Sequence, residues 1–236
     1  MTLNLDLSGR TALITGSGQG VGHGLARTFA EAGAAVLVND LRVQRAEEAA
    51  AEIRAGGGKA RALPFDVTDF AAVTAALADA GPVDILVNNA GNAGPEGFGS
   101  RGRFADSDPG QWEPFLRVNL YGVLYCTRAV LPAMEERRWG RVLTIISDAG
   151  RTGDAYGAAY GVSKAGAQGA LLFTPPNRAA MVFRRAMMSM RRSPLLRLVL
   201  TAIMKAVPSF QMRNSDITAE ATPPAELRAA GYSANE

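Results

Sequence analysis

Short apolar runs alternate with longer amphipathic stretches over the first 169 residues of the chain. Five aliphatic runs have the length of buried strands; they span residues 10–15, 34–40, 59–67, 83–91 and 141–147. Four stretches carry apolar residues at helical spacing; they span residues 21–33, 45–57, 69–79 and, approximately, 110–138. Strands and helices that alternate with short connections predict an α/β fold, a Rossmann-type doubly wound parallel sheet in a single domain.

The alternation ends after Gly169, and a basic segment follows. Residues 177–213 contain eight basic side chains and no acidic one. In this segment Arg197, Thr201 and Lys205 fall on one stripe of an expected helix whose other faces are apolar. The last residues are polar and include Pro223-Pro224, which predicts a disordered terminus.

The net charge of +3 and the isoelectric point near 9.3 come from this tail. Residues 1–164 hold 16 basic and 18 acidic side chains, a net of −2, whereas residues 165–236 hold 9 and 4, a net of +5. An excess confined to the tail does not indicate a nucleic-acid partner.

The rare residue types exclude several classes of site. Cys126 is the only cysteine, so an internal disulfide and a cysteine-based metal site are excluded, as suits a reducing compartment. His23 is the only histidine and has no evident partner in the sequence, which argues against a histidine triad or a zinc cluster. We also find no secretory signal pattern and no apolar run of 18 residues. These features predict a cytoplasmic protein without a metal.

A glycine-rich segment, "TGSGQGVG" at 15–22, lies between the first expected strand and the first expected helix. Gly16 permits a tight turn, Gly20 lets backbone amides approach a pyrophosphate, and Gly22 allows the helix to pack closely on the strand. The amino end of the helix adds unpaired N–H groups and a positive dipole. This arrangement predicts a dinucleotide site; the alternative is a simple glycine turn.

Asp40 stands at the end of the second expected strand, where a carboxylate can accept both hydroxyls of the adenosine ribose. The same carboxylate repels the 2′-phosphate of NADP. Arg42 and Arg45 lie nearby in the sequence and would soften that repulsion. We therefore expect NAD as the cofactor and NADP as the less favoured one.

The motifs together resemble the classical short-chain dehydrogenase/reductase family over about residues 8–169. They occur in the family's order: the glycine turn, Asp66-Val67, "NNAG" at 88–91, Asn119, Ser147, and "YGVSK" at 160–164. The resemblance implies cofactor contacts from Gly16, Ser17, Gln19, Gly20, Val21, Gly22, Asp40, Asp66, Val67, Asn88, Ala90, Gly91, Tyr160 and Lys164.

The resemblance also implies a catalytic group of Asn119, Ser147, Tyr160 and Lys164. A free tyrosine titrates near 10, so Tyr160 needs a nearby cation to act as a base at neutral pH. Lys164, one helical turn further on, would supply that cation and hold the nicotinamide ribose. Ser147 would donate a hydrogen bond to the substrate oxygen, and Asn119 would position a relay water.

The family pattern breaks after Gly169. No Pro-Gly pair follows, so the strand, covering helix and final strand that the resemblance implies are missing or replaced. Pro175-Pro176 predicts that the helix carrying Tyr160 ends by about residue 174. A shortened helix also argues against the homo-oligomer that the resemblance implies.

We divide the chain into an NAD(P)-binding domain with the catalytic group at 1–169 and a divergent basic helical tail at 170–236. Three interpretations of the tail stay open. It is a helical replacement that caps the site, an amphipathic surface that binds a membrane or a partner, or a sequence unrelated to the domain. We favour the third, as from a reading-frame shift or gene fusion. Membrane contact is less favoured, because basic amphipathic helices more often cover a core.

The sequence thus predicts an NAD-dependent oxidoreductase that transfers a hydride between nicotinamide and a secondary alcohol or ketone. The expected partner is this small molecule. The alternative is a dinucleotide-binding protein without turnover, a truncated or frame-shifted dehydrogenase whose tail contacts a partner or a membrane surface. The two differ in whether the substrate site is enclosed.

Overall fold

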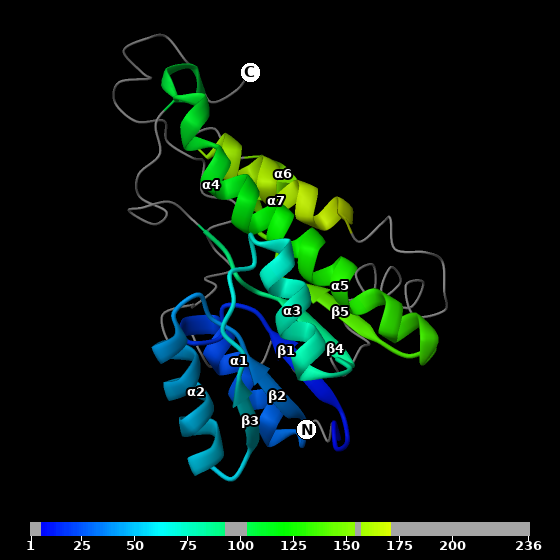
Figure 1. Ribbon diagram of the computed structural model, residues 1–236. Helices are drawn as coiled ribbons and strands as arrows, with labels where there is room; N and C mark the ends of the chain where they lie inside the picture. The colour runs from blue at the N-terminus through cyan, green and yellow to red at the C-terminus, as the bar shows by residue number, and fades with distance from the viewer. Residues whose placement is uncertain (1–5, 93–102, 154–156, 171–236) are drawn as a thin grey trace, which may run out of the picture.

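The computed structural model describes residues 6–92, 103–153 and 157–170 (Figure 1). Within these residues five strands form one parallel sheet in the order β3-β2-β1-β4-β5. The strands are β1 (Thr11–Ile14), β2 (Ala35–Val38), β3 (Lys59–Ala62), β4 (Ile85–Asn88) and β5 (Arg141–Thr144). The strand order reverses between β1 and β4, the place where open α/β sheets bind ligands at the carboxyl ends of their strands.

Helices cover both faces of the sheet (Figure 1). The longer ones are α1 (Gly20–Glu31), α2 (Val43–Ala55), α3 (Phe70–Ala80), α5 (Gly122–Glu136) and α7 (Ala158–Ala170). Short segments are the 3₁₀ turns η2 (Phe104–Asp106) and η3 (Pro109–Gln111), α4 (Glu113–Leu116), the π-helical η4 (Arg117–Tyr121) and α6 (Ala149–Thr152). Figure 1 shows α4 and α5 in one continuous rod, with α6 and α7 beside its upper half.

Two hydrophobic clusters, one on each face, explain why the strands are apolar throughout. Ile14, Val38 and Val87 pack under α1 and α2 with Leu25 and Phe29. Their sequence neighbours point to the other face, where Leu13, Leu37 and Leu86 pack under α3 and α5 with Val73 and Cys126. Successive strand residues alternate between faces, and both faces are buried, so no polar alternation remains. The predicted doubly wound α/β fold is confirmed.

The predicted strands and long helices occur with shifted boundaries, and short elements such as η2, η4 and α6 were not predicted. The expected strand at 59–67 ends at Ala62, because the residues that follow turn into the loop before α3. The expected helix at 110–138 is interrupted by η4, a five-residue π-helical segment. The loop at 148–158 contains α6. The predicted helix end near residue 174 and the stripe of Arg197, Thr201 and Lys205 lie outside the described residues.

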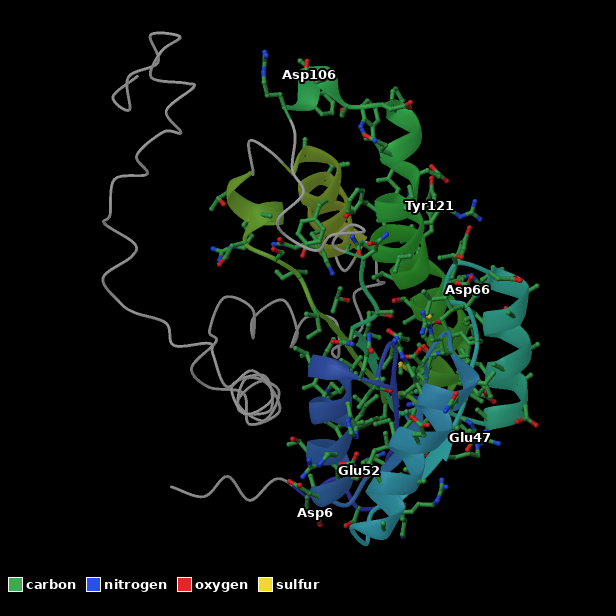
Figure 2. All side chains as sticks on the ribbon, turned by 90° about the vertical axis from the view of Figure 1, so that its left-hand side faces the viewer. Asp6, Glu47, Glu52, Asp66, Asp106 and Tyr121 are labelled. Atoms are coloured by element: carbon green, nitrogen blue, oxygen red, sulfur yellow. The ribbon has the colours of Figure 1, made fainter. Side chains whose placement is uncertain are left out.

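His23, which has no evident partner in the sequence, lies beside Glu52, although its buried Nε2 forms no hydrogen bond with the described residues. Its Nε2 lies 3.4 Å from Glu52 Oε2, which brings α1 against α2, and Arg27 lies 3.7 Å from the same carboxylate. Figure 2 shows Glu52 where these two helices meet. In the part of the chain that the structure describes, no helix is long and apolar enough to cross a membrane.

Candidate active site

The glycine turn between β1 and α1 has the backbone that the sequence predicts. Gly16 and Gly20 have φ of 62° and 58°, the left-handed region that favours glycine. A Cβ on Gly16 would lie 2.9 Å from the Cα of Ala90, and a Cβ on Gly22 would overlap the carbonyl oxygen of Gly16. A Cβ on Gly20 would project into open space at the amino end of α1. The turn therefore leaves room for a ligand at the helix dipole.

Hydrogen bonds to the segment after β4 hold the turn in place. Thr15 Oγ1 accepts from the backbone N–H groups of Asn89 and Ala90, both at 3.0 Å. Asn89 Nδ2 donates back to the carbonyls of Thr15 and Gly16 at 2.9 and 3.1 Å. Ser17 is buried, and its hydroxyl donates to Ile14 at 2.7 Å. Thr15 and Asn89 were not among the predicted site residues, although Asn89 belongs to the "NNAG" motif.

The other two predicted residues of the turn differ in exposure. Gln19 is exposed and occupies the N-cap of α1, where its carbonyl accepts from the N–H of His23 at 3.2 Å. Val21 is partly buried and packs against the core cluster under α1. Gln19 is thus accessible to a ligand, whereas the side chain of Val21 stabilises the fold.

Asp40 is buried, with 6% of its surface exposed, and follows β2. One carboxylate oxygen accepts from the N–H of Arg42 at 2.9 Å. The other faces the glycine turn, where a Cβ on Gly18 would lie 2.6 Å from it. Arg42 is exposed and Arg45 is partly buried. The carboxylate is therefore held beside the phosphate-binding turn, at the adenosine end of the expected site.

Asp66 and Val67 follow β3, and they contribute differently. Asp66 Oδ1 accepts from the N–H of Thr68 at 2.8 Å, and Figure 2 shows Asp66 near the amino end of α3. The side chain of Val67 is buried, and a Cβ on Gly122 of α5 would lie 2.9 Å from its Cγ2. Only the backbone of Val67 thus remains for an adenine pocket.

Asn88 ends β4 and binds protein groups. Its Nδ2 donates to the hydroxyl of Thr127 at 3.1 Å and to that of Thr144 at 3.4 Å. The residue is buried, with 3% of its surface exposed, and its side chain links β4 to β5 and to α5. Asn88, which was predicted to contact the cofactor, therefore stabilises the sheet through its side chain.

Asn119 joins three parts of the molecule. It lies in η4 and is fully buried. Its Oδ1 accepts from the N–H of Asn92 at 2.7 Å, and its Nδ2 donates to the carbonyl of Asn92 at 2.9 Å. The same Nδ2 donates to Ser163 Oγ on α7 at 3.0 Å. The side chain therefore ties the segment after β4 to the helix that carries Tyr160.

Lys164 points into the space between the ends of β4 and β5. Its Nζ donates to the carbonyl of Ile145 at 3.1 Å. A Cβ on Gly91 would lie 3.4 Å both from this Nζ and from Asn119 Oδ1. Burial lowers the pKa of Lys164 to about 8, because the charged ammonium loses its hydration. The Lys164 ammonium and the Asn119 amide oxygen thus both lie beside Gly91.

Tyr160 lies one turn before Lys164 on α7 and is also buried. The ring of Phe115 meets its ring edge-on, with centroids 6.3 Å apart. Ser163 Oγ donates to the Tyr160 carbonyl at 2.7 Å, which continues the chain of bonds from Asn119. Phe115 and Ser163 were missed in the sequence, because their roles depend on contacts between distant elements.

Ser147 lies between β5 and α6, two residues after the Lys164 acceptor. Its Oγ accepts from the N–H of Ala149 at 3.3 Å. Gly150 lets α6 lie directly on α7, since a Cβ there would be 2.9 Å from the Lys164 carbonyl carbon. The predicted residues therefore fall into two groups, around β1–β3 and around β4, β5 and α7, which meet at Gly16 and Ala90.

The described residues contain no group of three or more His, Cys, Asp or Glu side chains that could hold a metal ion. The groups that do converge are a tyrosine, a lysine, amides and hydroxyls. They can exchange protons and donate hydrogen bonds to a ligand at the carboxyl ends of the strands.

Comparison with known proteins identifies the family of this chain. A family model described as short chain dehydrogenase matches residues 10–172. The 7α-hydroxysteroid dehydrogenase of Escherichia coli (strain K12) is 37% identical over 168 residues, which cover 70% of this chain and 63% of that protein. The chain spans 55 to 63% of the length of the first curated relatives it matches.

Solved structures of the same kind superpose on the domain. A gluconate 5-dehydrogenase from Burkholderia cenocepacia, in complex with NADP and tartrate, has a TM-score of 0.64 and 38% identity, over 70% of this chain and 64% of that one. A 3-oxoacyl-[acyl-carrier protein] reductase from Brucella melitensis with bound NAD has a TM-score of 0.66 and 32% identity, over 73% and 66%. By sequence and by structure, this chain belongs to the short-chain dehydrogenase family.

Proposed function

We propose that this chain is an NAD-dependent oxidoreductase that transfers a hydride between nicotinamide and a secondary alcohol or ketone. The observation that carries the proposal is the placement of Lys164. Its buried Nζ is bound to the Ile145 carbonyl, one helical turn from Tyr160, and its helix is tied to Asn119 through Ser163. A buried ammonium one helical turn from a tyrosine can stabilise the phenolate that a tyrosine base needs.

The residues present fit a dinucleotide. The open space at Gly20 and the amino end of α1 would hold the pyrophosphate, and Asp40 would hold the adenosine ribose. Bound NAD supplies the hydride acceptor. The free hydrogens of the Lys164 ammonium would bind the nicotinamide ribose, since one hydrogen is already donated to Ile145.

Each catalytic side chain has a defined task in this proposal. Tyr160, as the phenolate that Lys164 stabilises, accepts the proton of the substrate hydroxyl and becomes a neutral phenol. Ser147 donates a hydrogen bond to the substrate oxygen. Both polar atoms of the Asn119 side chain bond to Asn92 and Ser163. We therefore assign the relay water to the main-chain carbonyl of Asn119, in the π-helical turn.

The buried carboxylate of Asp40 supports NAD over NADP. A 2′-phosphate there would meet a negative charge that the backbone N–H of Arg42 already orients. Arg42 is exposed and could reach a phosphate from solvent, and similar proteins have been solved with NADP as well as NAD. Cofactor preference is therefore a proposal that rests on Asp40.

A second function, dinucleotide binding without turnover, is favoured by one observation. The family match ends at residue 172, and the basic tail lies beyond it. In this alternative, residues 1–169 form the binding domain. Residues 170–236 are then a tail that has a separate origin or contacts a partner or a membrane surface. In the first function, the substrate is a small-molecule alcohol or ketone. In both functions, the location is cytoplasmic.

Titration of the purified full chain with NADH and with NADPH tests binding. Energy transfer from Trp112 or Trp139 to the bound nicotinamide reports it. Micromolar NADH binding with weaker NADPH binding is the expected result. If the folded protein binds neither cofactor, both functions are wrong.

Turnover then separates the two functions. Secondary alcohols are screened with NAD against the Tyr160→Phe variant, which should lose at least a hundredfold in kcat while it keeps NADH binding. Tyr121→Phe is the matched control, because Tyr121 is 41% exposed on the rod that carries α5 (Figure 2). Binding without Tyr160-dependent turnover on any alcohol would leave the non-catalytic alternative.

A further inference from the structure

Asn39 is a buried polar residue to which the family motifs assign no role. It follows β2 and directly precedes Asp40. Its exposed fraction is 1%, and it is among the largest fully buried side chains of the described residues. Such a side chain needs hydrogen-bond partners to offset the loss of its hydration. In this molecule those partners lie in two different walls of the proposed cofactor site.

Every polar group of Asn39 is used. Its Oδ1 accepts from the N–H of Gly16 at 3.3 Å. Its Nδ2 donates to the carbonyls of Leu63 and Phe65 at 3.2 and 3.0 Å. Its backbone carbonyl accepts from the N–H of Ser17 at 2.7 Å, and its own N–H donates to Ile14 at 3.2 Å. The acceptor faces an N–H and the donors face carbonyls, which determines the orientation of the amide.

These bonds connect three segments that leave the sheet at its carboxyl edge. Gly16 and Ser17 begin the phosphate-binding turn after β1. Phe65 directly precedes Asp66, at the expected adenine wall after β3. Asp40, next to Asn39, is the expected ribose acceptor. One side chain thus sets the distance between the phosphate turn and the adenine wall, with the ribose carboxylate beside it.

We propose that Asn39 is a positioning residue that pre-organises the adenosine half of the dinucleotide site. This inference rests on the proposed function. Without the amide, the turn at Gly16 loses one of its anchors, and two buried carbonyls lose their donors. The cost then appears in the affinity for the adenosine portion of the cofactor, because the free protein no longer holds the bound geometry. The catalytic groups at Tyr160 and Lys164 lie on the β4–β5 side and keep their geometry.

The test compares wild type with Asn39→Ala and Asn39→Asp in the full-length chain. Asn39→Asp keeps the acceptor for Gly16 but loses at least one of the two donated bonds, and its shape is the same. Dissociation constants are measured for NADH and for ADP-ribose, which lacks the nicotinamide. We expect both constants to rise at least tenfold in Asn39→Ala, and at least as much in Asn39→Asp, whose buried carboxylate would face the carbonyls of Leu63 and Phe65 without a hydrogen to donate. At saturating NADH, kcat should stay within about threefold of wild type.

Met134→Ala is the control for lost stability alone. Met134 is 5% exposed and packs at the far end of α5, near Gly140. Its truncation should lower the unfolding midpoint through a cavity without a change in either dissociation constant. If Asn39→Ala and Asn39→Asp lose stability as Met134→Ala does and bind both ligands like wild type, Asn39 only stabilises the fold and the inference is wrong. Failure of the wild type itself to bind would instead overturn the proposed function.

Discussion

Gly18 lies directly against the carboxylate of Asp40. A Cβ at position 18 would be 2.6 Å from Asp40 Oδ2 and 2.8 Å from the Cβ of Arg45. Both distances are shorter than any relaxed contact of a methyl group, so this close approach requires glycine. Gly18 is not one of the three glycines that define the phosphate-binding turn. Its role here is to let the turn and Asp40 share the adenosine end of the site.

The substitution Gly18→Ala should therefore change cofactor preference. The methyl group would displace the Asp40 carboxylate, which removes an acceptor from the ribose and moves a negative charge away from a 2′-phosphate. We expect the NADH dissociation constant to rise about tenfold, which corresponds to ~1.4 kcal/mol, and the NADPH constant to rise less. Titration with both cofactors checks the ratio. Gly56→Ala is the control, since a Cβ there meets only atoms 3.5 Å away or further; an unchanged ratio in Gly18→Ala would contradict the prediction.

The burial of Lys164 should make stability depend on pH. The folded pKa is about 8 and the ordinary value is 10.5, so burial disfavours the charged form. Below pH 8 both states are protonated and the cost is fully present. Between pH 8 and 10.5 the unfolded chain holds more protons, so this residue's contribution to stability rises with pH. The full span is at most about 3 kcal/mol.

Urea unfolding of wild type and Lys164→Met at pH 7.5, 8.5 and 9.5 measures this contribution. The methionine variant lacks the buried charge, so we expect it to be the more stable protein at pH 7.5. Its advantage should shrink toward pH 9.5, because the wild-type lysine becomes neutral. Other titrating groups cancel in the difference between the two proteins. If the free energies of unfolding of the two proteins changed with pH in parallel, the Lys164 ammonium would be well solvated in the fold, and the prediction would be wrong.

Removal of the Asn119 side chain should weaken both stability and turnover. Asn119→Ala leaves the N–H and carbonyl of Asn92 without their side-chain partner, and it removes the hydrogen bond from η4 to Ser163 on α7. Loss of a buried partner costs about 1–3 kcal/mol. Ser163→Ala removes the bond from Asn119 to α7 and the Ser163 bond to the Tyr160 carbonyl, and it leaves both bonds between Asn119 and Asn92 intact. We expect a smaller loss of stability in Ser163→Ala than in Asn119→Ala, measured by urea midpoints. Equal losses in the two variants would show that the bonds between Asn119 and Asn92 add nothing to stability.

Gly22 should tolerate no side chain. A Cβ there would overlap the carbonyl oxygen of Gly16 and lie 2.5 Å from Asn89 Nδ2, so Gly22→Ala must push α1 away from the turn. Overpacking of this kind costs about 1–3 kcal/mol. We expect a lower thermal midpoint together with loss of NADH binding. Gly169→Ala on α7 is the control, because nothing lies within 4 Å of its Cβ and alanine favours a helix. A Gly22→Ala protein with a wild-type midpoint would contradict the close packing.

The sequence by itself determined the fold class and the order of the elements. Strands such as Ile85–Asn88 are buried on both faces because helices cover both faces of the sheet. A short, continuous apolar run can be recognised from the local sequence alone. The glycines at 16, 20 and 22 predicted a strand–turn–helix because a left-handed backbone and a close approach each demand glycine. The spacing of Tyr160 and Lys164 predicted that both lie on one face of a helix, because residues four apart are neighbours on a helix surface.

Only the tertiary structure decided which polar side chains face the site and which brace the sheet. Asn88, Asn89 and Asn39 are the same residue type at strand ends, yet one binds threonines in the core, one binds the glycine turn, and one spans β1 to β3. Their partners lie 22 or more residues away in the sequence, so no local pattern encodes them. The lowered pKa of Lys164 likewise arises from burial, which depends on how α7, β4 and β5 pack together.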